Sequence, residues 1–111
     1  MPNRPYPAVM RYGLCLPNYT ALASADAIHA VGAVADRLAY ESVWTTDHVL
    51  VDRSADAADY RINFDVMQTL AWVGARHPGL GLGTSVIVVP QRNAIVVAKE
   101  LARSTPCRPG G

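Results

Sequence analysis

The sequence of 111 residues predicts an α/β fold built on a parallel sheet. Three short apolar runs, at residues 10–16, 42–46 and 80–89, are typical of strands, and helix-like segments separate them. Strands that alternate with helices imply right-handed crossovers in a parallel sheet, as found in doubly wound folds and in barrels. The nearly continuous apolar character of the first run fits a strand that is buried on both faces of such a sheet.

The composition and net charge of the chain exclude several classes of function. Hydrophobic residues make up 50% of the chain and charged residues 17%, which is typical of a globular domain with a modest core. The net charge of +1, without a basic run, argues against nucleic acid or an anionic membrane as a partner. No apolar stretch approaches the roughly 20 residues that cross a bilayer, and the N-terminus lacks the hydrophobic core of a signal peptide. Cys15 and Cys107 give neither a disulfide framework nor a metal spacing, so we expect a cytoplasmic protein without a metal site.

The first helix is predicted over residues 25–39. Ser24 is a good N-cap, and Asp26 lies in the first turn, near the positive end of the helix dipole. His29 falls off the apolar stripe of this helix, and we expect it to be a solvated surface residue. The stripe itself, at helical spacing, consists of Ile28, Val31, Val34, Ala35 and Leu38.

Two further helices are predicted after a polar segment at residues 49–62, which reads as a loop long enough to line a site. The second helix covers residues 64–76, with Asn63 as its cap, and the third covers residues 94–102, with Asn93 as its cap. In the second helix, the residues expected in the core are Phe64, Met67, Leu70, Ala71 and Trp72.

Polar residues follow each predicted strand. Asn18 follows the first strand, Asp47 and His48 follow the second, and Ser85 lies in the third. Parallel strands bring their carboxyl ends to one edge, where α/β folds bind ligands, so we expect these residues to gather there. A histidine is well suited to proton transfer near neutral pH. From the residues alone, however, an Asp-His pair after a strand is as often a loop cap as a catalytic pair, and Thr84 and Ser85 could equally be small residues that fill a barrel.

Three segments carry a resemblance to a known family. They read Tyr12-Gly-Leu-Cys-Leu-Pro17, Ala35-Asp-Arg-Leu-Ala-Tyr-Glu-Ser-Val-Trp-Thr-Thr-Asp-His48 and Leu82-Gly-Thr-Ser-Val-Ile-Val-Val-Pro90. Over residues 10–102 the chain resembles the bacterial luciferase-like monooxygenases, most closely their coenzyme F420-dependent branch. The resemblance implies a TIM (β/α)8 barrel, of which this chain carries the first three βα units. It also implies an oxidoreductase that moves a hydride between F420, or alternatively FMN, and a small organic substrate.

The same resemblance implies site residues. His48 matches the family histidine beside the deazaflavin ring, which is implicated in proton transfer or ring positioning, and Asp47 matches the neighbouring acid; these two are the expected catalytic residues. Thr84, Ser85 and Val86 are the further residues expected to bind the cofactor. The bond between Ser85 and Val86 falls where family members carry a non-prolyl cis peptide behind the isoalloxazine ring.

Two positions depart from the family pattern. Ala39 stands where a glycine usually ends the first helix, and Ala94 stands where a proline commonly opens the third. A left-handed backbone at an alanine costs about 1 kcal/mol relative to glycine, so Ala39 is expected to be a mildly strained position.

The ends of the chain do not resemble the family. Residues 1–9 read as a flexible tail, residues 10–102 as the N-terminal part of the barrel, and residues 103–111 as a non-family tail. One allowed codon set for this tail, read two bases later, gives Leu-Asp-Ala-Leu-Ser-Pro-Gly-Arg, a family-like continuation, so we expect a one-base frameshift after Ala102. The truncated chain is expected to lack activity by itself. The alternatives are a non-catalytic remnant and a small α/β binding module that assembles with another chain, or into homo-oligomers, through exposed barrel edges.

Overall fold

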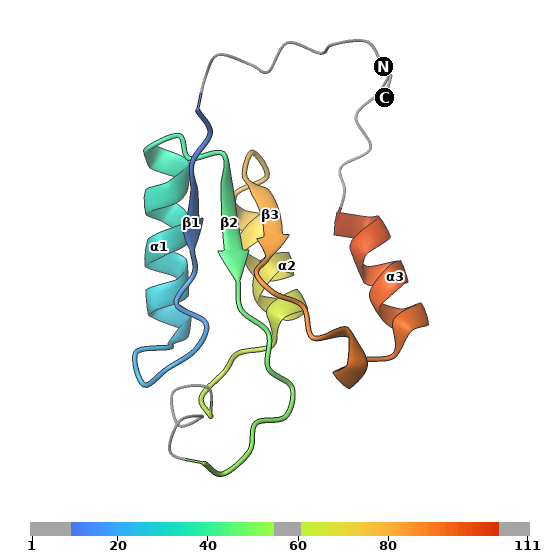
Figure 1. Ribbon diagram of the computed structural model, residues 1–111. Helices are drawn as coiled ribbons and strands as arrows, with labels where there is room; N and C mark the ends of the chain where they lie inside the picture. The colour runs from blue at the N-terminus through green and yellow to red at the C-terminus, as the bar shows by residue number, and fades with distance from the viewer. Residues whose placement is uncertain (1–9, 55–60, 105–111) are drawn as a thin grey trace.

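A computed structural model describes residues 10–54 and 61–104, and in this part of the chain strands and helices alternate as predicted (Figure 1). The predicted tail at residues 1–9 and the end of the chain from residue 105 lie outside the described residues. The elements are, in order, β1 (Gly13–Cys15), α1 (Ala25–Arg37), β2 (Ser42–Thr45), α2 (Val66–Arg76), β3 (Gly81–Thr84), the short 3-10 helix η2 (Val89–Gln91) and α3 (Ala94–Ser104).

The strands form one parallel sheet in the order β1-β2-β3, with Leu14, Val43 and Leu82 side by side. The predicted α/β class with a parallel sheet is therefore confirmed for the described residues. The strands are shorter than predicted, and β3 differs most, because the apolar run continues to Val89 although pairing ends at Thr84. Beyond that point the chain leaves the sheet, and the amide of Val88 donates to a side chain instead of a neighbouring strand.

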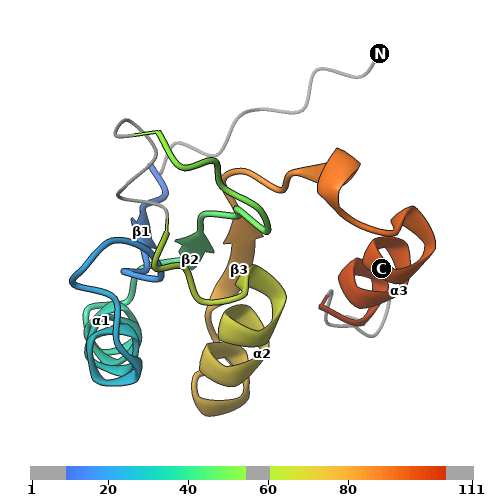
Figure 2. The ribbon, with the colours of Figure 1, turned by 90° about the horizontal axis from the view of Figure 1, so that it is seen from below.

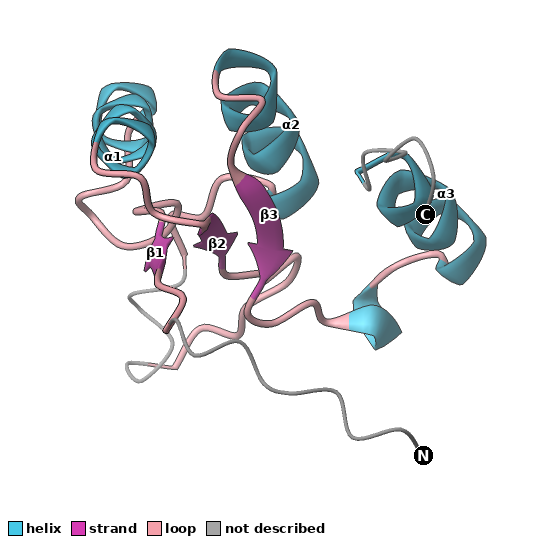
Figure 3. Cartoon of the chain, turned by 90° about the horizontal axis from the view of Figure 1, so that it is seen from above, coloured by secondary structure: helices cyan, strands magenta, loops and turns pink. Residues whose placement is uncertain are grey.

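Helices α1 and α2 cover the same face of the sheet, and no helix of the described residues covers the other (Figures 2 and 3). Successive side chains of a strand point to opposite faces, so Leu14, Val43 and Leu82 face these helices. Their burial, with that of the helix stripes, forms the hydrophobic core. Its buried members are Leu16, Ile28, Ala35, Val43, Val66, Met67, Leu70, Val73 and Leu80.

Helix α1 begins as its sequence predicts. The hydroxyl of Ser24 accepts a hydrogen bond from the amide of Ala27 at 3.0 Å. The helix ends at Arg37, earlier than predicted, so Leu38 is its C-cap residue and is exposed rather than part of the buried stripe. Ala39 follows with φ of 55°, which is the left-handed conformation expected at this position.

Helix α2 differs from the prediction at its start. Asp65, and not Asn63, caps the helix, because the carboxylate of Asp65 accepts from the amide of Gln68 at 2.9 Å. The side chain of Asn63 is instead engaged in long-range hydrogen bonds described below. The helix therefore starts later, and the predicted core positions Phe64 and Ala71 are exposed. The stripe is completed by Val66, Met67, Thr69, Leu70 and Val73.

Helix α2 also carries an aromatic residue, Trp72. Trp72 is half-buried and packs against the core, as predicted, and the guanidinium of Arg76 lies 4.5 Å from the centre of its ring. His29 is exposed on α1, also as predicted, and its ring centre lies 5.9 Å from that of Trp72.

Helix α3 stands apart from the sheet (Figure 1). Asn93 caps it as predicted, since its side-chain oxygen accepts from the amides of Ile95 at 3.0 Å and Val96 at 3.3 Å. Of residues 94–102, only Val97 is buried, and Ile95 is 81% exposed. None of the described helices is both long and apolar enough to cross a membrane.

Candidate functional site

The predicted site residues lie at or just beyond the carboxyl ends of the strands, where β2 and β3 lead into the lower loops of Figure 1. The amide of Ser85 donates to the carbonyl of Thr45 at 2.8 Å, in the last pair of β2 and β3, that of Thr45 with Thr84. The hydroxyl of Thr46 then donates to the carbonyl of Ser85 at 3.2 Å. These two bonds hold the segment after β3 against the end of β2.

Asn18 ties the end of β1 to the same edge. It is fully buried, its side-chain amide donates to the carbonyl of Thr46 at 2.7 Å, and its side-chain oxygen accepts from the amide of Thr46 at 3.1 Å. The same amide group donates to the side-chain oxygen of Asn63 at 3.1 Å. Asn18 thus satisfies the backbone of a chain segment that has left the sheet, as buried polar groups require.

Asp47 is buried in a charged hydrogen-bond network. Its side chain is 3% exposed and that of Arg92 is 12% exposed. The guanidinium donates to both carboxylate oxygens, from Nη2 to Oδ1 at 2.5 Å and from Nε to Oδ2 at 2.9 Å. The amide of Val88 also donates to Oδ2 at 2.9 Å. Arg92 further contacts the carboxylate of Asp65, the cap of α2, at 3.3 Å.

The electrostatics of this network keep Asp47 ionised. The hydrogen bond from Arg92 is the largest cause that holds the pKa of Asp47 below its ordinary value, and it outweighs the opposing effect of burial. The hydrogen bond to Asp47 in turn raises the pKa of Arg92. The carboxylate therefore receives three donors in a fixed fork, which is the geometry of a structural ion pair.

His48 follows directly and is half-buried. Its carbonyl accepts from the side-chain amide of Asn63 at 3.4 Å. Among the described residues, no group of three or more His, Cys, Asp and Glu side chains is arranged to hold a metal ion.

The bond between Ser85 and Val86 is a cis peptide, as expected at this position. Both residues are exposed, with Val86 at 60%, whereas Thr84 is half-buried at the end of β3. The segment is fixed from its far side by Gln91, whose side-chain oxygen accepts from the amides of Val49 at 3.0 Å and Leu50 at 3.2 Å. The exposed cis peptide is thus anchored at both ends, by hydrogen bonds to β2 and to the loop that follows it.

Arg92 and Gln91 were not predicted from the sequence as site residues. They lie in the short polar segment between Pro90 and Asn93, which reads as an ordinary loop. A usable signal existed: an acid placed directly after a buried strand needs a cationic partner if it is itself buried. That reasoning points to Arg92, because it follows the next strand of a parallel sheet.

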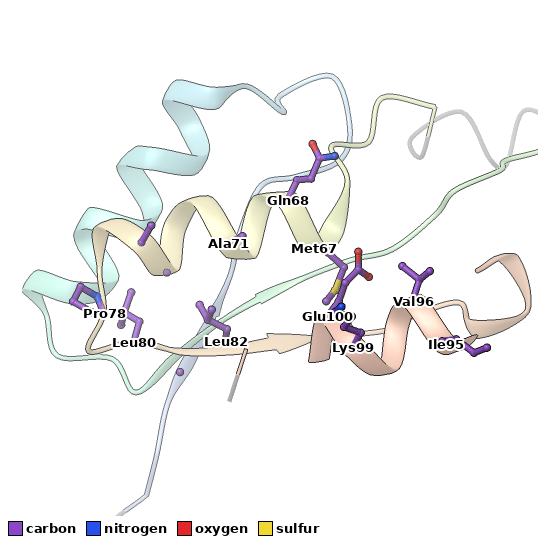
Figure 4. A pocket seen from close by; sticks show the side chains of 13 residues that line it. Met67, Gln68, Ala71, Pro78, Leu80, Leu82, Ile95, Val96, Lys99 and Glu100 are labelled. Carbon is purple, nitrogen blue, oxygen red and sulfur yellow. The ribbon is translucent and has the colours of Figure 1, made fainter. Parts of the chain in front are cut away.

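An apolar cavity of about 890 Å³ lies elsewhere, between α2, β3 and α3. Figure 4 shows side chains from these three elements around it, including Met67 and Leu82, with Lys99 and Glu100 on the α3 side. None of the predicted site residues lines this cavity. The cavity forms in the space between α3 and the pair α2 and β3. It is therefore distinct from the strand-end site.

Comparison with known proteins gives one match. The sequence model of a family described as luciferase-like monooxygenase matches residues 10–103. Neither the curated proteins nor the solved structures contain a match to the chain.

Proposed function

The chain belongs to the luciferase-like monooxygenase family, and from this premise we propose that it forms the first three βα units of a (β/α)8 barrel and part of a flavin-type oxidoreductase site. The reaction proposed is hydride transfer between coenzyme F420, or alternatively FMN, and a small organic substrate. One observation carries the proposal. Hydrogen bonds with Thr45 and Thr46 hold Ser85 beside the end of β2, so the exposed residues Ser85 and Val86 lie close to the strand end that leads to His48, where parallel strands bind ligands.

The residues present fit a flat ring system. Thr84, Ser85 and Val86 offer small side chains and backbone rather than bulky groups, and the last two are exposed. When bound, F420 or FMN would supply the hydride chemistry. In this proposal the three residues would support the ring, and His48 would hold or move a proton at its imidazole.

Asp47 takes a different part in the proposal. Its catalytic role stays a prediction, but a carboxylate that already accepts three hydrogen bonds and whose pKa is lowered by Arg92 is a weak proton acceptor. We therefore assign it, together with Arg92, a positioning role. Their ion pair joins the end of β2 to the segment that carries the cis peptide, so it sets the distance between His48 and that segment.

Cofactor binding tests the proposal. The 111-residue chain is dialysed to equilibrium against FMN and, separately, against F420, and bound cofactor is measured by its absorbance. We expect one of the two to bind, and we expect His48→Ala to weaken that binding several-fold because the ring loses a neighbour. His29→Ala is the matched control, since His29 is an exposed histidine on the helix layer, and it should leave binding unchanged. Absence of binding by either cofactor, or equal effects of both variants, would contradict the proposal.

A second candidate is a binding module that assembles with another chain. The order β1-β2-β3 leaves the outer edges of β1 and β3 without a strand partner among the described residues, and exposed strand edges favour association. Light scattering after size-exclusion chromatography distinguishes the candidates, because a module of this kind elutes as a defined oligomer whose mass does not depend on cofactor.

A further inference from the structure

The face of the sheet opposite α1 and α2 carries one large side chain, that of Trp44 in β2. Side chains alternate along each strand, so Trp44 shares this face with Gly13 in β1 and Gly83 in β3. Gly83 is paired with Trp44, and Gly13 is paired with Ser42, two residues before Trp44. A Cβ atom on Gly83 would lie 2.5 Å from Cε3 of the indole, and one on Gly13 would lie 2.5 Å from its Nε1. The two ends of the ring therefore rest on glycines of opposite neighbouring strands, and the indole lies flat across all three.

The indole is also fixed in place. Its Nε1 donates to the hydroxyl of Ser42 at 2.9 Å, which satisfies its one polar atom on the same face of the same strand. Trp44 is nevertheless 39% exposed. One face of the ring packs on the glycine backbone, and the other face is open. A flat aromatic surface that is already immobile binds a planar partner without losing further side-chain freedom.

This open ring face is continuous with the strand-end site. Thr46 lies two residues beyond Trp44, about 7 Å along an extended chain, and its hydroxyl donates to the carbonyl of Ser85. Ser85 lies two residues beyond Gly83, on which the indole rests, and begins the cis peptide. A planar ligand held against Ser85 and Val86 would thus reach the indole if it extends from the strand ends toward the middle of the sheet.

We propose that the exposed face of Trp44 is a stacking surface for the planar ring of the bound cofactor. This inference rests on the proposed function, because it concerns the same ligand. It adds a binding residue in the interior of strand β2, away from the polar strand-end residues. The competing arrangement, in which the indole only fills the interior of a closed barrel, leaves the cofactor ring out of contact with Trp44.

The test uses FMN as the probe and excites the flavin directly, so that energy transfer from tryptophan does not contribute. An indole in van der Waals contact quenches flavin emission by electron transfer, whereas a phenylalanine ring does not. The chain has two tryptophans, which gives a matched pair of variants. Trp72→Phe keeps only Trp44, and Trp44→Phe keeps only Trp72, whose ring lies on the helix layer under Arg76.

We expect FMN bound to the wild type and to Trp72→Phe to lose most of its emission, and FMN bound to Trp44→Phe to regain it. A third variant, Trp44→Leu, removes the aromatic face and should weaken FMN binding about tenfold by equilibrium dialysis, as expected for one lost stacking contact. Trp72→Leu is its control and should bind FMN as the wild type does.

Each outcome decides the inference. FMN that binds but keeps its emission in Trp72→Phe overturns the stacking role and leaves the proposed function intact. Failure of the wild type to bind FMN in dialysis overturns both, unless F420 binds, in which case the same variants are measured with F420 emission. Should Trp44→Leu fail to fold, the comparison of cofactor emission between Trp72→Phe and Trp44→Phe decides: because the five tyrosines can also quench flavin emission, a Trp44→Phe variant that stays quenched overturns the stacking role.

Discussion

Replacing Arg92 with methionine should lower the stability of the chain more than any change to a surface charge. In the wild type the carboxylate of Asp47 is 3% exposed and receives two hydrogen bonds from Arg92 and one from the amide of Val88. The substitution leaves a buried carboxylate with the single backbone donor. Removing one partner of a buried ion pair costs about 3–5 kcal/mol, a large share of the roughly 5–15 kcal/mol that stabilises a typical domain.

The dependence of this loss on pH follows from the pKa of Asp47. Arg92 lowers that pKa in the folded wild type, so the stabilisation is present above the unfolded value of about 3.9 and is lost as pH falls through the folded pKa. Without Arg92, burial dominates and should raise the pKa of Asp47 above its unfolded value. The variant then loses most stability at neutral pH, where the buried carboxylate of Asp47 must be charged. The difference in stability between wild type and variant should therefore shrink from pH 7 to below pH 4.

Urea unfolding at pH 7 and at low pH, followed by far-ultraviolet circular dichroism, measures both effects. Arg11→Met is the matched control, because the ion pair of Arg11 with Glu41 is 64% and 44% exposed and such pairs contribute about 0–1 kcal/mol. Arg92→Lys keeps the positive charge but loses the two parallel hydrogen bonds to Asp47, so its loss of stability should lie between those of Arg92→Met and Arg11→Met. The reasoning is refuted if Arg92→Met and Arg11→Met have equal effects, or if the loss from Arg92→Met does not change with pH.

Three further predictions concern the backbone. Ala39→Gly should raise the free energy of unfolding by about 0.5–1 kcal/mol, since glycine accepts the φ of 55° without strain; a lower midpoint in urea would contradict this. Asn18→Ala should lower it by about 3 kcal/mol, because buried backbone groups lose their partner; a loss below about 1 kcal/mol would show that water replaces the amide. Gly83→Ala should destabilise the chain and shift the emission of Trp44, because the new Cβ would meet the indole. Gly79→Ala is the control: with nothing within 4 Å of its new Cβ, it should be neutral or slightly stabilising. Equal urea midpoints for the two variants would contradict the placement of the indole on Gly83.

Local signals predicted the helix ends where the deciding contacts span only a few residues. Ser24 and Asn93 cap their helices because each side chain reaches an amide two or three residues ahead, which the sequence displays directly. The left-handed conformation of Ala39 was expected only from the family resemblance, in which a glycine is usual at this position. Parallel pairing followed from the order of strands and helices alone.

Signals that depend on distant partners were missed. Asn63 and Asp65 are both good caps in isolation, but Asn63 is withdrawn from the helix by bonds to Asn18 and to the carbonyl of His48. The ion pair of Asp47 with Arg92 joins residues that are 45 positions apart, so no local pattern marks it. In the first case a tertiary contact decided between two caps that the sequence left equal, and in the second the pairing depends on which strand ends the fold brings together.

The strand-end site is assembled by side chains that bond to backbone, and this explains how it holds its shape where the sheet has ended. Asn18 binds the backbone of Thr46, Asp47 binds the amide of Val88, and Gln91 binds the amides of Val49 and Leu50. Each bond gives a hydrogen-bond partner to a backbone group that lies beyond the last paired residues of the strands. None of these bonds involves a residue of α3. The geometry of this edge is therefore set by the contacts among the three strands, α2 and the loops between them, and it does not require α3 to pack against the sheet.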